Sequence, residues 1–220
     1  MKNMQVTKLH KEIDQLQQKH GSSKLASIYG AGCLQEPKAV FVFMNPTGRN
    51  ISASIKWSGL RAPWLGTKNV WRLLYELRLL SDTNYKLTQA LLPSEWTEHF
   101  SKTLYGELVK NKVYITNLAK CTQEDARPIP NKVFQQYLAN TKKELSCLRP
   151  QKIISFGNQV SSILLDKSIM VSKYRSIQSE NLQIEKVTYK VYPVYYPVGQ
   201  GQRNMPLALK RSKSVCRERV

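Results

Sequence analysis

The sequence predicts an α/β protein, a three-layer sandwich in which a central four-stranded, mainly parallel sheet carries helices on both faces. The first observation is an alternation. A strand-like apolar run and an amphipathic helical stretch follow one another four times, as in parallel sheets with helical crossovers. The second is residues 39–44 (AVFVFM), an unbroken apolar run typical of a strand covered on both faces. No internal repeat or low-complexity linker interrupts the pattern, so residues 1–220 are expected to form a single domain.

The N-terminal part of the chain predicts a helix and then the first strand. Residues 6–19 are polar apart from a thin apolar stripe at helical spacing, and Gly21 is a stop signal. We therefore assign residues 1–27 to an N-terminal helical segment. Residues 39–44 form the first strand, which runs directly into a turn cluster at residues 45–48 (NPTG).

The rest of the chain predicts three more strands and five helices. The strands are expected at residues 112–116 (KVYIT), 152–156 (KIISF) and 187–195 (VTYKVYPVY). The helices are expected in a segment capped by Thr67, at residues 95–109 and 131–148, from Gly157 to residue 165, and at residues 207–215. The last helix lies in a basic C-terminal segment, residues 207–220.

The charge of the chain is strongly one-sided. There are 34 Lys and Arg residues against 15 Asp and Glu, a formal net charge of +19. The chain is nevertheless 41% hydrophobic, with four Trp and eleven Tyr, which excludes a disordered basic tail. The longest apolar run, residues 39–44, is too short for a transmembrane helix. We expect a monomeric, cytoplasmic protein without a membrane partner (nucleoid-associated in a prokaryote, nuclear in a eukaryote), whose charge attracts a polyanion.

Cysteine and histidine spacing gives no sign of a metal or cofactor site. The four cysteines stand at positions 33, 121, 147 and 216 with no CxxC pair, and the three histidines form no HExxH motif. Reduced thiols are the expectation, and neither a metal nor another cofactor is predicted.

Four polar segments follow the predicted strands. In open parallel sheets, ligands bind outside the carboxyl ends of the strands. The segments at these ends are residues 45–49 (NPTGR), 117–121 (NLAKC), 157–158 (GN) and 196–203 (YPVGQGQR). We expect them to form one cleft that is rich in amide and basic groups and poor in carboxylates.

Five motifs follow one another between residues 28 and 210. They are FMNPTG at 43–48, GLRAPWLGTKNVWRLL at 59–74, VYITNLAKC at 113–121, IISFG at 153–157 and VYYPVGQGQR at 194–203. This ordered set resembles the uracil-DNA glycosylase superfamily. The Asn-Pro pair of the first motif is similar to the mismatch-specific and single-strand-selective branches. The third motif is more similar to the bacterial and archaeal iron–sulfur branch, but that branch's cluster cysteines are absent, so no cluster is expected.

The resemblance implies a monofunctional DNA glycosylase of base excision repair. Such an enzyme hydrolyses the N-glycosidic bond of uracil or another deaminated base in single- or double-stranded DNA. It flips the nucleotide out of the stack, reads the base, stabilises the departing charge and directs a water at the sugar.

Three residues take base-handling places in this resemblance. Trp64 stands where the superfamily has an aromatic under the flipped base, although an aromatic is also an ordinary core residue. Asn117 resembles the asparagine that reads the uracil edge with one donor and one acceptor, although an asparagine after a strand also suits a turn. Asn45 takes the water-positioning place. An amide cannot abstract a proton, so its role is to hold and align the water, although Asn-Pro also favours turns. Met44 and Gly48 flank this turn and are expected to contact the substrate.

The last motif departs from the usual His-Pro of the superfamily. Tyr196 stands in place of the histidine that stabilises the departing base, and a neutral phenol donates a hydrogen bond with less charge stabilisation. The loop at residues 199–203 corresponds to the segment that wedges into the duplex, with Gln202 or Arg203 filling the gap. A solvated glycine-rich loop is the alternative. The residues expected to contact DNA are Arg49, Lys120, Gly199, Gln202 and Arg203.

Two other functions remain open on the sequence. One is a catalytically weak or inactive nucleic-acid-binding protein on the same fold, in which Tyr196 marks lost catalysis. The other is a nucleotide-processing hydrolase unrelated to the superfamily, because a fold by itself does not determine function.

Overall fold

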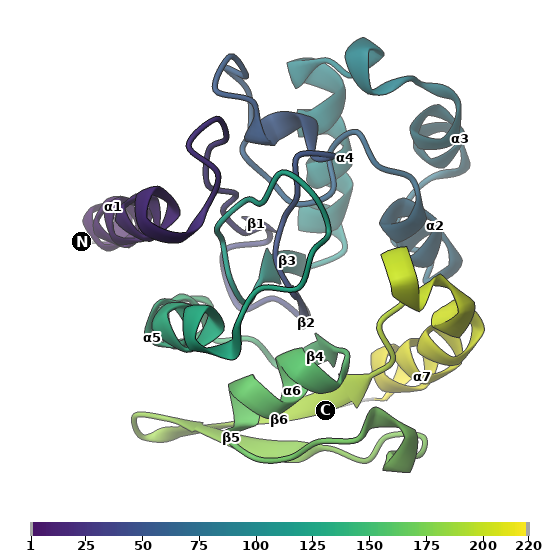
Figure 1. Ribbon diagram of the computed structural model, residues 1–220. Helices are drawn as coiled ribbons and strands as arrows, with labels where there is room; N and C mark the ends of the chain where they lie inside the picture. The colour runs from purple at the N-terminus through teal and green to yellow at the C-terminus, as the bar shows by residue number, and fades with distance from the viewer. Residues whose placement is uncertain (1, 219–220) are drawn as a thin grey trace.

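The middle layer of the molecule is a mixed sheet of six strands in the order β1-β3-β2-β4-β6-β5 (Figure 1). The structure is a computed structural model that describes residues 2–218. Met1 and the last two residues of the predicted basic C-terminal segment, Arg219 and Val220, lie outside the described residues. The strands are β1 (Ala31–Gly32), β2 (Ala39–Phe43), β3 (Val113–Asn117), β4 (Ile153–Phe156), β5 (Glu180–Ile184) and β6 (Val187–Val194).

The four strands in the centre of the sheet, β3, β2, β4 and β6, run parallel to one another. They correspond to the four predicted strands. At the edges, β1 pairs antiparallel with β3, and β5 pairs antiparallel with β6. The α/β class is therefore confirmed, whereas the prediction of a four-stranded sheet is wrong because it omits both edge strands.

Both omitted strands lack the apolar run on which the prediction depended. β1 has only two residues, and one of them is a glycine. Burial alternates along β5 (ENLQI), where only Leu182 and Ile184 are buried, as expected of an edge strand with one solvent-exposed face. Such strands are set by the neighbour they pair with more than by their own composition.

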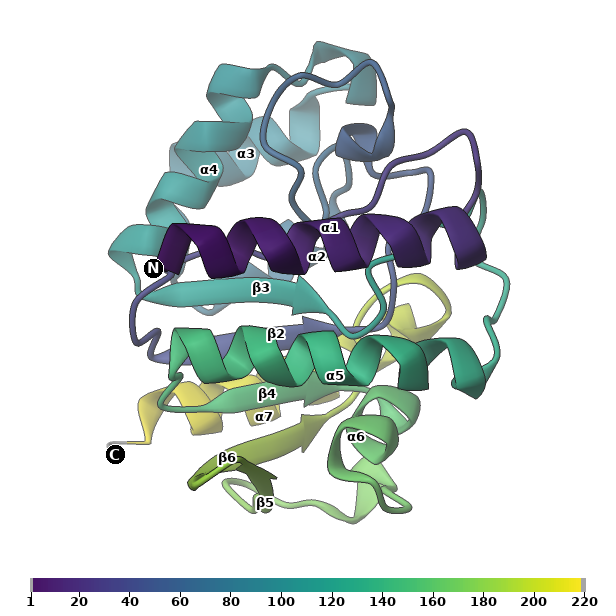
Figure 2. The same ribbon diagram turned by 90° about the vertical axis from the view of Figure 1, so that its left-hand side faces the viewer.

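Helices cover both faces of the sheet. One face carries α1 (Lys2–His20), α5 (Asn131–Leu148) and α6 (Asn158–Leu165), and the other carries α2 (Asn69–Glu76), α4 (Glu98–Lys110) and α7 (Met205–Arg217). Figure 2 shows α1 and α5 in front of the strands and α7 behind them. A further helix, α3 (Asp82–Ala90), packs against α2.

Alternation along the strands supplies a core to each helical layer. Phe41 and Phe43 of β2 face the α2, α4 and α7 layer, where Trp71 is fully buried. Val40 and Val42 face the α1, α5 and α6 layer. Successive strand residues point to opposite faces, so β2, which is buried along its whole length, contributes to both cores.

Helix boundaries differ from the prediction at several ends. Thr67 does not cap α2, because its hydroxyl donates to the Trp64 carbonyl (2.7 Å) and the N-cap position is Lys68. The helix predicted at residues 95–109 begins instead after Thr97, whose hydroxyl accepts from the Phe100 backbone N–H (3.1 Å). Within the described part of the chain, no helix is long and apolar enough to cross a membrane.

Candidate active site

The loops that leave β2 and β3 are hydrogen-bonded side by side. Backbone N–H groups of Leu118 and Ala119 donate to the carbonyls of Phe43 (2.8 Å) and Met44 (3.0 Å). Further out, Gln123 N–H donates to the Pro46 carbonyl (3.2 Å), and Gly48 N–H donates back to Gln123 (2.7 Å). The two segments that carry Asn45 and Asn117 are thus fixed to each other at the carboxyl ends of their strands.

Phe43, the last residue of β2, is the centre of an aromatic cluster. Its ring stacks on that of Phe156 at the end of β4, with centroids 4.4 Å apart. Trp64 and Tyr196 approach the same ring edge-on, at 5.0 and 6.3 Å. Asn117 is the register partner of Phe43 across the β2–β3 pair. The structure therefore gathers three of the predicted site residues around one phenylalanine.

Asn117 is buried, and its side-chain amide oxygen has no partner in the described part of the protein. The residue is 1% exposed, and its Oδ1 has no hydrogen-bond partner among the described residues. Asn117 shares its strand face with Val113 and Ile115, which belong to the same core as Phe43. Leaving such an atom unpaired costs on the order of 1–3 kcal/mol, a cost that a hydrogen-bond donor reaching Oδ1 would remove.

Trp64 has a strained backbone and a second unsatisfied polar atom. Its φ of 68° lies in the left-handed region, which is unusual for a bulky residue. The conformation is held through its carbonyl, which accepts from the Thr67 N–H, the Thr67 hydroxyl and the Trp71 indole at 3.1, 2.7 and 3.0 Å. The Trp64 Nε1 is buried without a partner in the described part of the chain. Trp64 thus packs on the core and also presents a free donor there.

Tyr196 is packed between two glycines. A Cβ on Gly201 would lie 2.2 Å from the Tyr196 carbonyl oxygen, and a Cβ on Gly157 would lie 3.3 Å from the Tyr196 Cβ. Burial raises the pKa of the Tyr196 phenol, so the group is neutral and able to donate a hydrogen bond at neutral pH.

Asn45 is half-buried in the turn after β2. Its Nδ2 donates to the carbonyl of Pro46 (3.1 Å), which fixes the orientation of the amide and leaves Oδ1 as an acceptor. Met44, by contrast, packs against the core on the α1, α5 and α6 face, opposite to Phe43. The contact between Met44 and substrate stays a prediction, and the structure places this half-buried side chain on the face of the sheet opposite to Phe43 and Trp64.

The predicted DNA-contacting residues separate into two groups. Arg49, Gln202 and Arg203 are exposed, and the last two lie with Gly199 on a 3₁₀ turn (Gly199–Asn204) that begins three residues after Tyr196. Lys120 is different. Its side chain is 0% exposed and forms an ion pair with Glu144 at 2.8 Å. The expectation that Lys120 contacts DNA is corrected by this burial, because its ammonium is not available to a phosphate.

Some residues that shape this region were not identified from the sequence. Phe43 and Phe156 end apolar runs, so their position gave only a core signal. Gln17 of α1 is 6% exposed; its Oε1 accepts from Thr122 N–H (2.7 Å), and its Nε2 donates to the Leu25 carbonyl (3.0 Å). A glutamine in a polar helix carries no sequence signal for this role, which is to attach α1 to the loop that follows β3.

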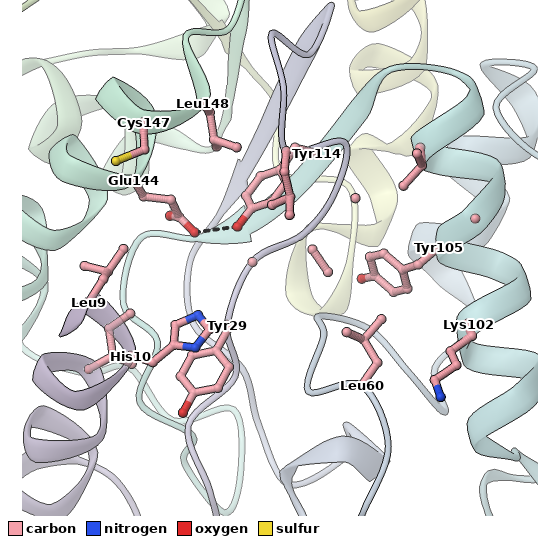
Figure 3. Close-up of a pocket in the computed structure, with 17 residues that line it drawn as sticks. Leu9, His10, Tyr29, Leu60, Lys102, Tyr105, Tyr114, Glu144, Cys147 and Leu148 are labelled. Atoms are coloured by element: carbon pink, nitrogen blue, oxygen red, sulfur yellow. Dashed lines mark hydrogen bonds between the residues drawn. The ribbon is translucent and has the colours of Figure 1, made fainter. Parts of the chain in front are cut away.

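A separate cavity of about 460 Å³ lies at the β1 edge of the sheet. Figure 3 shows its walls, which come from α1, β1, α4 and α5, and the hydrogen bond from the Tyr114 hydroxyl to Glu144 (2.8 Å). The walls are largely apolar and include none of the predicted site residues. Across residues 2–218, no group of three or more His, Cys, Asp or Glu side chains is placed to hold a metal ion.

A comparison with protein-family models found no match, and a comparison with curated proteins found none either.

Proposed function

We propose that this chain is a monofunctional DNA glycosylase that hydrolyses the N-glycosidic bond of uracil or another deaminated base. The observation that carries the proposal is the buried, unpartnered amide oxygen (Oδ1) of Asn117 beside the aromatic cluster of Phe43, Trp64 and Tyr196. This group lies at the carboxyl ends of parallel strands, where ligands bind in open α/β sheets.

Asn117 reads the edge of the flipped base in this proposal. Its Oδ1 accepts from a ring N–H, and its Nδ2 donates to the neighbouring carbonyl oxygen. Deaminated bases such as uracil and hypoxanthine present this pair, whereas cytosine and adenine present the reverse. Because the protein leaves Oδ1 without a partner, a base with the wrong edge would leave a buried acceptor unpaired, and this is a strong basis for discrimination.

The departing base and the attacking water are handled by Tyr196 and Asn45. The neutral phenol of Tyr196 donates a hydrogen bond to the base as negative charge develops on it. Asn45 holds the water with its free Oδ1, while its Nδ2 stays on the Pro46 carbonyl. Neither group is a strong acid or base, so the proposal is for slow chemistry that depends on orientation.

Binding energy for nucleotide flipping comes from the phosphates. Arg49 and Arg203 are exposed on the two loops that flank the aromatic cluster, and the chain carries a net charge of +19. Unstacking one nucleotide costs about a few kcal/mol, which a small number of phosphate contacts can offset.

The test is an excision assay. Single-stranded and duplex oligonucleotides with one uracil, hypoxanthine or xanthine are incubated with the protein, and abasic sites are then cleaved with alkali. We expect strand scission with the wild type and its loss with Asn117→Ala at unchanged affinity for undamaged DNA. Absence of scission at stoichiometric protein, with salt-sensitive binding retained, would refute the glycosylase.

That second outcome corresponds to an alternative function, a nucleic-acid-binding protein on the same fold. The observation that favours it is Tyr196, a phenol in the place of a histidine, in a site whose named residues include no carboxylate. In this alternative, the Asn117→Ala variant and the wild type bind damaged and undamaged DNA alike.

A further inference from the structure

Lys120 is a buried lysine whose ammonium group is fully hydrogen-bonded within the protein. Its side chain is 0% exposed, three residues beyond the end of β3. Its Nζ donates to the backbone carbonyl of Asn117 (2.7 Å), to Glu144 Oε2 (2.8 Å) and to the Thr141 hydroxyl (3.2 Å). An ammonium has three donors, so each of them has a partner.

Glu144 of α5 completes the same network from the other side. It is 6% exposed, and it accepts from the Tyr114 hydroxyl (2.8 Å, Figure 3), from the Thr116 hydroxyl (3.0 Å) and from Lys120. Tyr114 and Thr116 alternate with Asn117 along β3, so they point to the opposite face of the sheet. The charged pair therefore lies behind Asn117, while the amide faces the aromatic cluster.

The network attaches the end of β3 to α5. Lys120 binds the carbonyl of Asn117, and the Thr141 hydroxyl donates to the next carbonyl, that of Leu118 (3.1 Å). A buried ion pair is weak evidence for stability, because desolvation opposes the Coulomb attraction and apolar residues of similar volume often do as well. A pair at this position has a more specific effect, since it fixes the peptide plane from which the Asn117 side chain projects.

We propose that Lys120 and Glu144 are positioning residues that hold the Asn117 amide in its base-reading orientation. This inference rests on the glycosylase proposed above. The pair does not touch the base. It acts by tethering the Asn117 carbonyl, so that the amide meets the ring N–H and the carbonyl of the base without reorganising. A misplacement of about 1 Å at a reacting group costs as much as about 100-fold in rate.

The experiment uses the full chain with the variant Lys120→Met/Glu144→Gln, which removes both charges and retains similar volume. We expect single-turnover excision of uracil to fall about 10- to 100-fold, with a changed ratio of uracil to hypoxanthine excision and an unchanged affinity for undamaged DNA. A loss of folded protein would lower both excision rates by the same factor and leave the ratio unchanged.

A second readout does not require catalysis. The side-chain amide of Asn117 gives a pair of ¹H–¹⁵N signals, identified by their absence in Asn117→Ala. We expect these signals to shift and broaden in the double variant. Lys152→Met is the matched control, because Lys152 is also a buried lysine (5% exposed), bonded to the Val215 carbonyl (2.9 Å) at the opposite end of the sheet. It should leave both the excision ratio and the Asn117 signals unchanged.

The outcomes separate this inference from the proposed function. An active wild type, together with a folded double variant whose excision ratio and Asn117 signals are unchanged, overturns the positioning role alone. An inactive wild type refutes the glycosylase. The Asn117 amide signals then test the positioning role by themselves, and identical signals in the wild type and the double variant overturn that role. If the double variant does not fold, Thr141→Val is used in its place. It removes the hydrogen bond from Lys120 to the Thr141 hydroxyl and the one from that hydroxyl to the Leu118 carbonyl, without a change of charge. Its excision ratio and Asn117 signals are judged in the same way.

Discussion

Asn117 and Trp64 each hold a buried polar side-chain atom that has no hydrogen-bond partner among the described residues. Buried polar atoms are almost always hydrogen-bonded, yet Asn117 Oδ1 and Trp64 Nε1 have no partner within residues 2–218 and lie beside the same phenylalanine. One is an acceptor and the other a donor. Trp64 adds backbone strain at φ 68°, which persists only where surrounding contacts fix it. The unpaired acceptor, the unpaired donor and the strained backbone thus lie together around Phe43, which is the region that the proposed function uses.

The first prediction at this scale concerns Asn117→Asp. The substitution keeps the shape of the side chain but replaces the Nδ2 donor with a second acceptor or, when protonated, a single movable donor. We expect excision of uracil to fall by about 10²-fold or more and the preference among bases to change, with a smaller effect on affinity for undamaged DNA, in which no base enters the site. An equal loss on uracil, hypoxanthine and xanthine would show that Asn117 does not read the base edge.

A second prediction concerns Tyr196. Because burial raises the pKa of its phenol, the group keeps its proton through the neutral range, and wild-type excision should not fall from pH 7 to 9 through its ionisation. Tyr196→Phe removes the donor and should slow excision about 10²- to 10³-fold. Tyr196→His supplies an oriented imidazole and should speed excision. Single-turnover excision rates on uracil are measured for the wild type across this pH range and for both variants. A Phe variant as fast as the wild type would remove Tyr196 from the site.

At the scale of elements, the site depends on how loops are attached to the elements around them. The loop after β3 is bound to the loop after β2 through backbone hydrogen bonds, to α1 through Gln17, and to α5 through Lys120. β1 has two residues, and the cavity at the β1 edge of the sheet is partly bounded by Gly106 of α4. The candidate site therefore lies on the central strands of the sheet, and the cavity at the β1 edge is separate from it.

Gly106 allows a test of this difference. A Cβ at Gly106 would meet no atom within 4 Å, and glycine in a helix interior costs about 0.5–1 kcal/mol relative to alanine. We expect Gly106→Ala to raise the free energy of unfolding by about that amount in urea titrations and to leave excision unchanged.

The matched substitution is Gly201→Ala, where the Cβ would lie 2.2 Å from the Tyr196 carbonyl oxygen. This variant should be less stable than the wild type and should lose excision because Tyr196 is displaced. A Gly106→Ala variant that is destabilised would show that the space beside α4 is closed in solution.

At the scale of the molecule, sequence patterns predicted what depends on local periodicity. The four central strands and most helices follow apolar runs and helical stripes, and the carboxyl-end rule correctly brought the segments of Asn45, Asn117 and Tyr196 together. Lys120 was misassigned because a lysine in a strand-end loop has the same sequence signal whether it faces solvent or a buried glutamate on a distant helix. Its partner, Glu144, is 24 residues away. Pairings of this kind, like the edge strands, are decided by tertiary packing.

The net charge of +19 is a property of the whole molecule and supports a prediction about DNA binding. Each phosphate contact releases counterions, so the logarithm of the binding constant should fall linearly with the logarithm of salt concentration, by about 0.9 per contact on duplex DNA. Arg49 and Arg203 are exposed on the loops beside the aromatic cluster. The double variant Arg49→Gln/Arg203→Gln should therefore lower the slope by about two, as measured by fluorescence anisotropy with undamaged duplex.

Lys143→Gln is the control, because Lys143 pairs with Glu12 (2.8 Å) on the helical face formed by α1 and α5. A slope that falls equally in the control, or in neither variant, would mean that the charge attracts DNA to the surface in general and that the strand-end loops do not form the binding face.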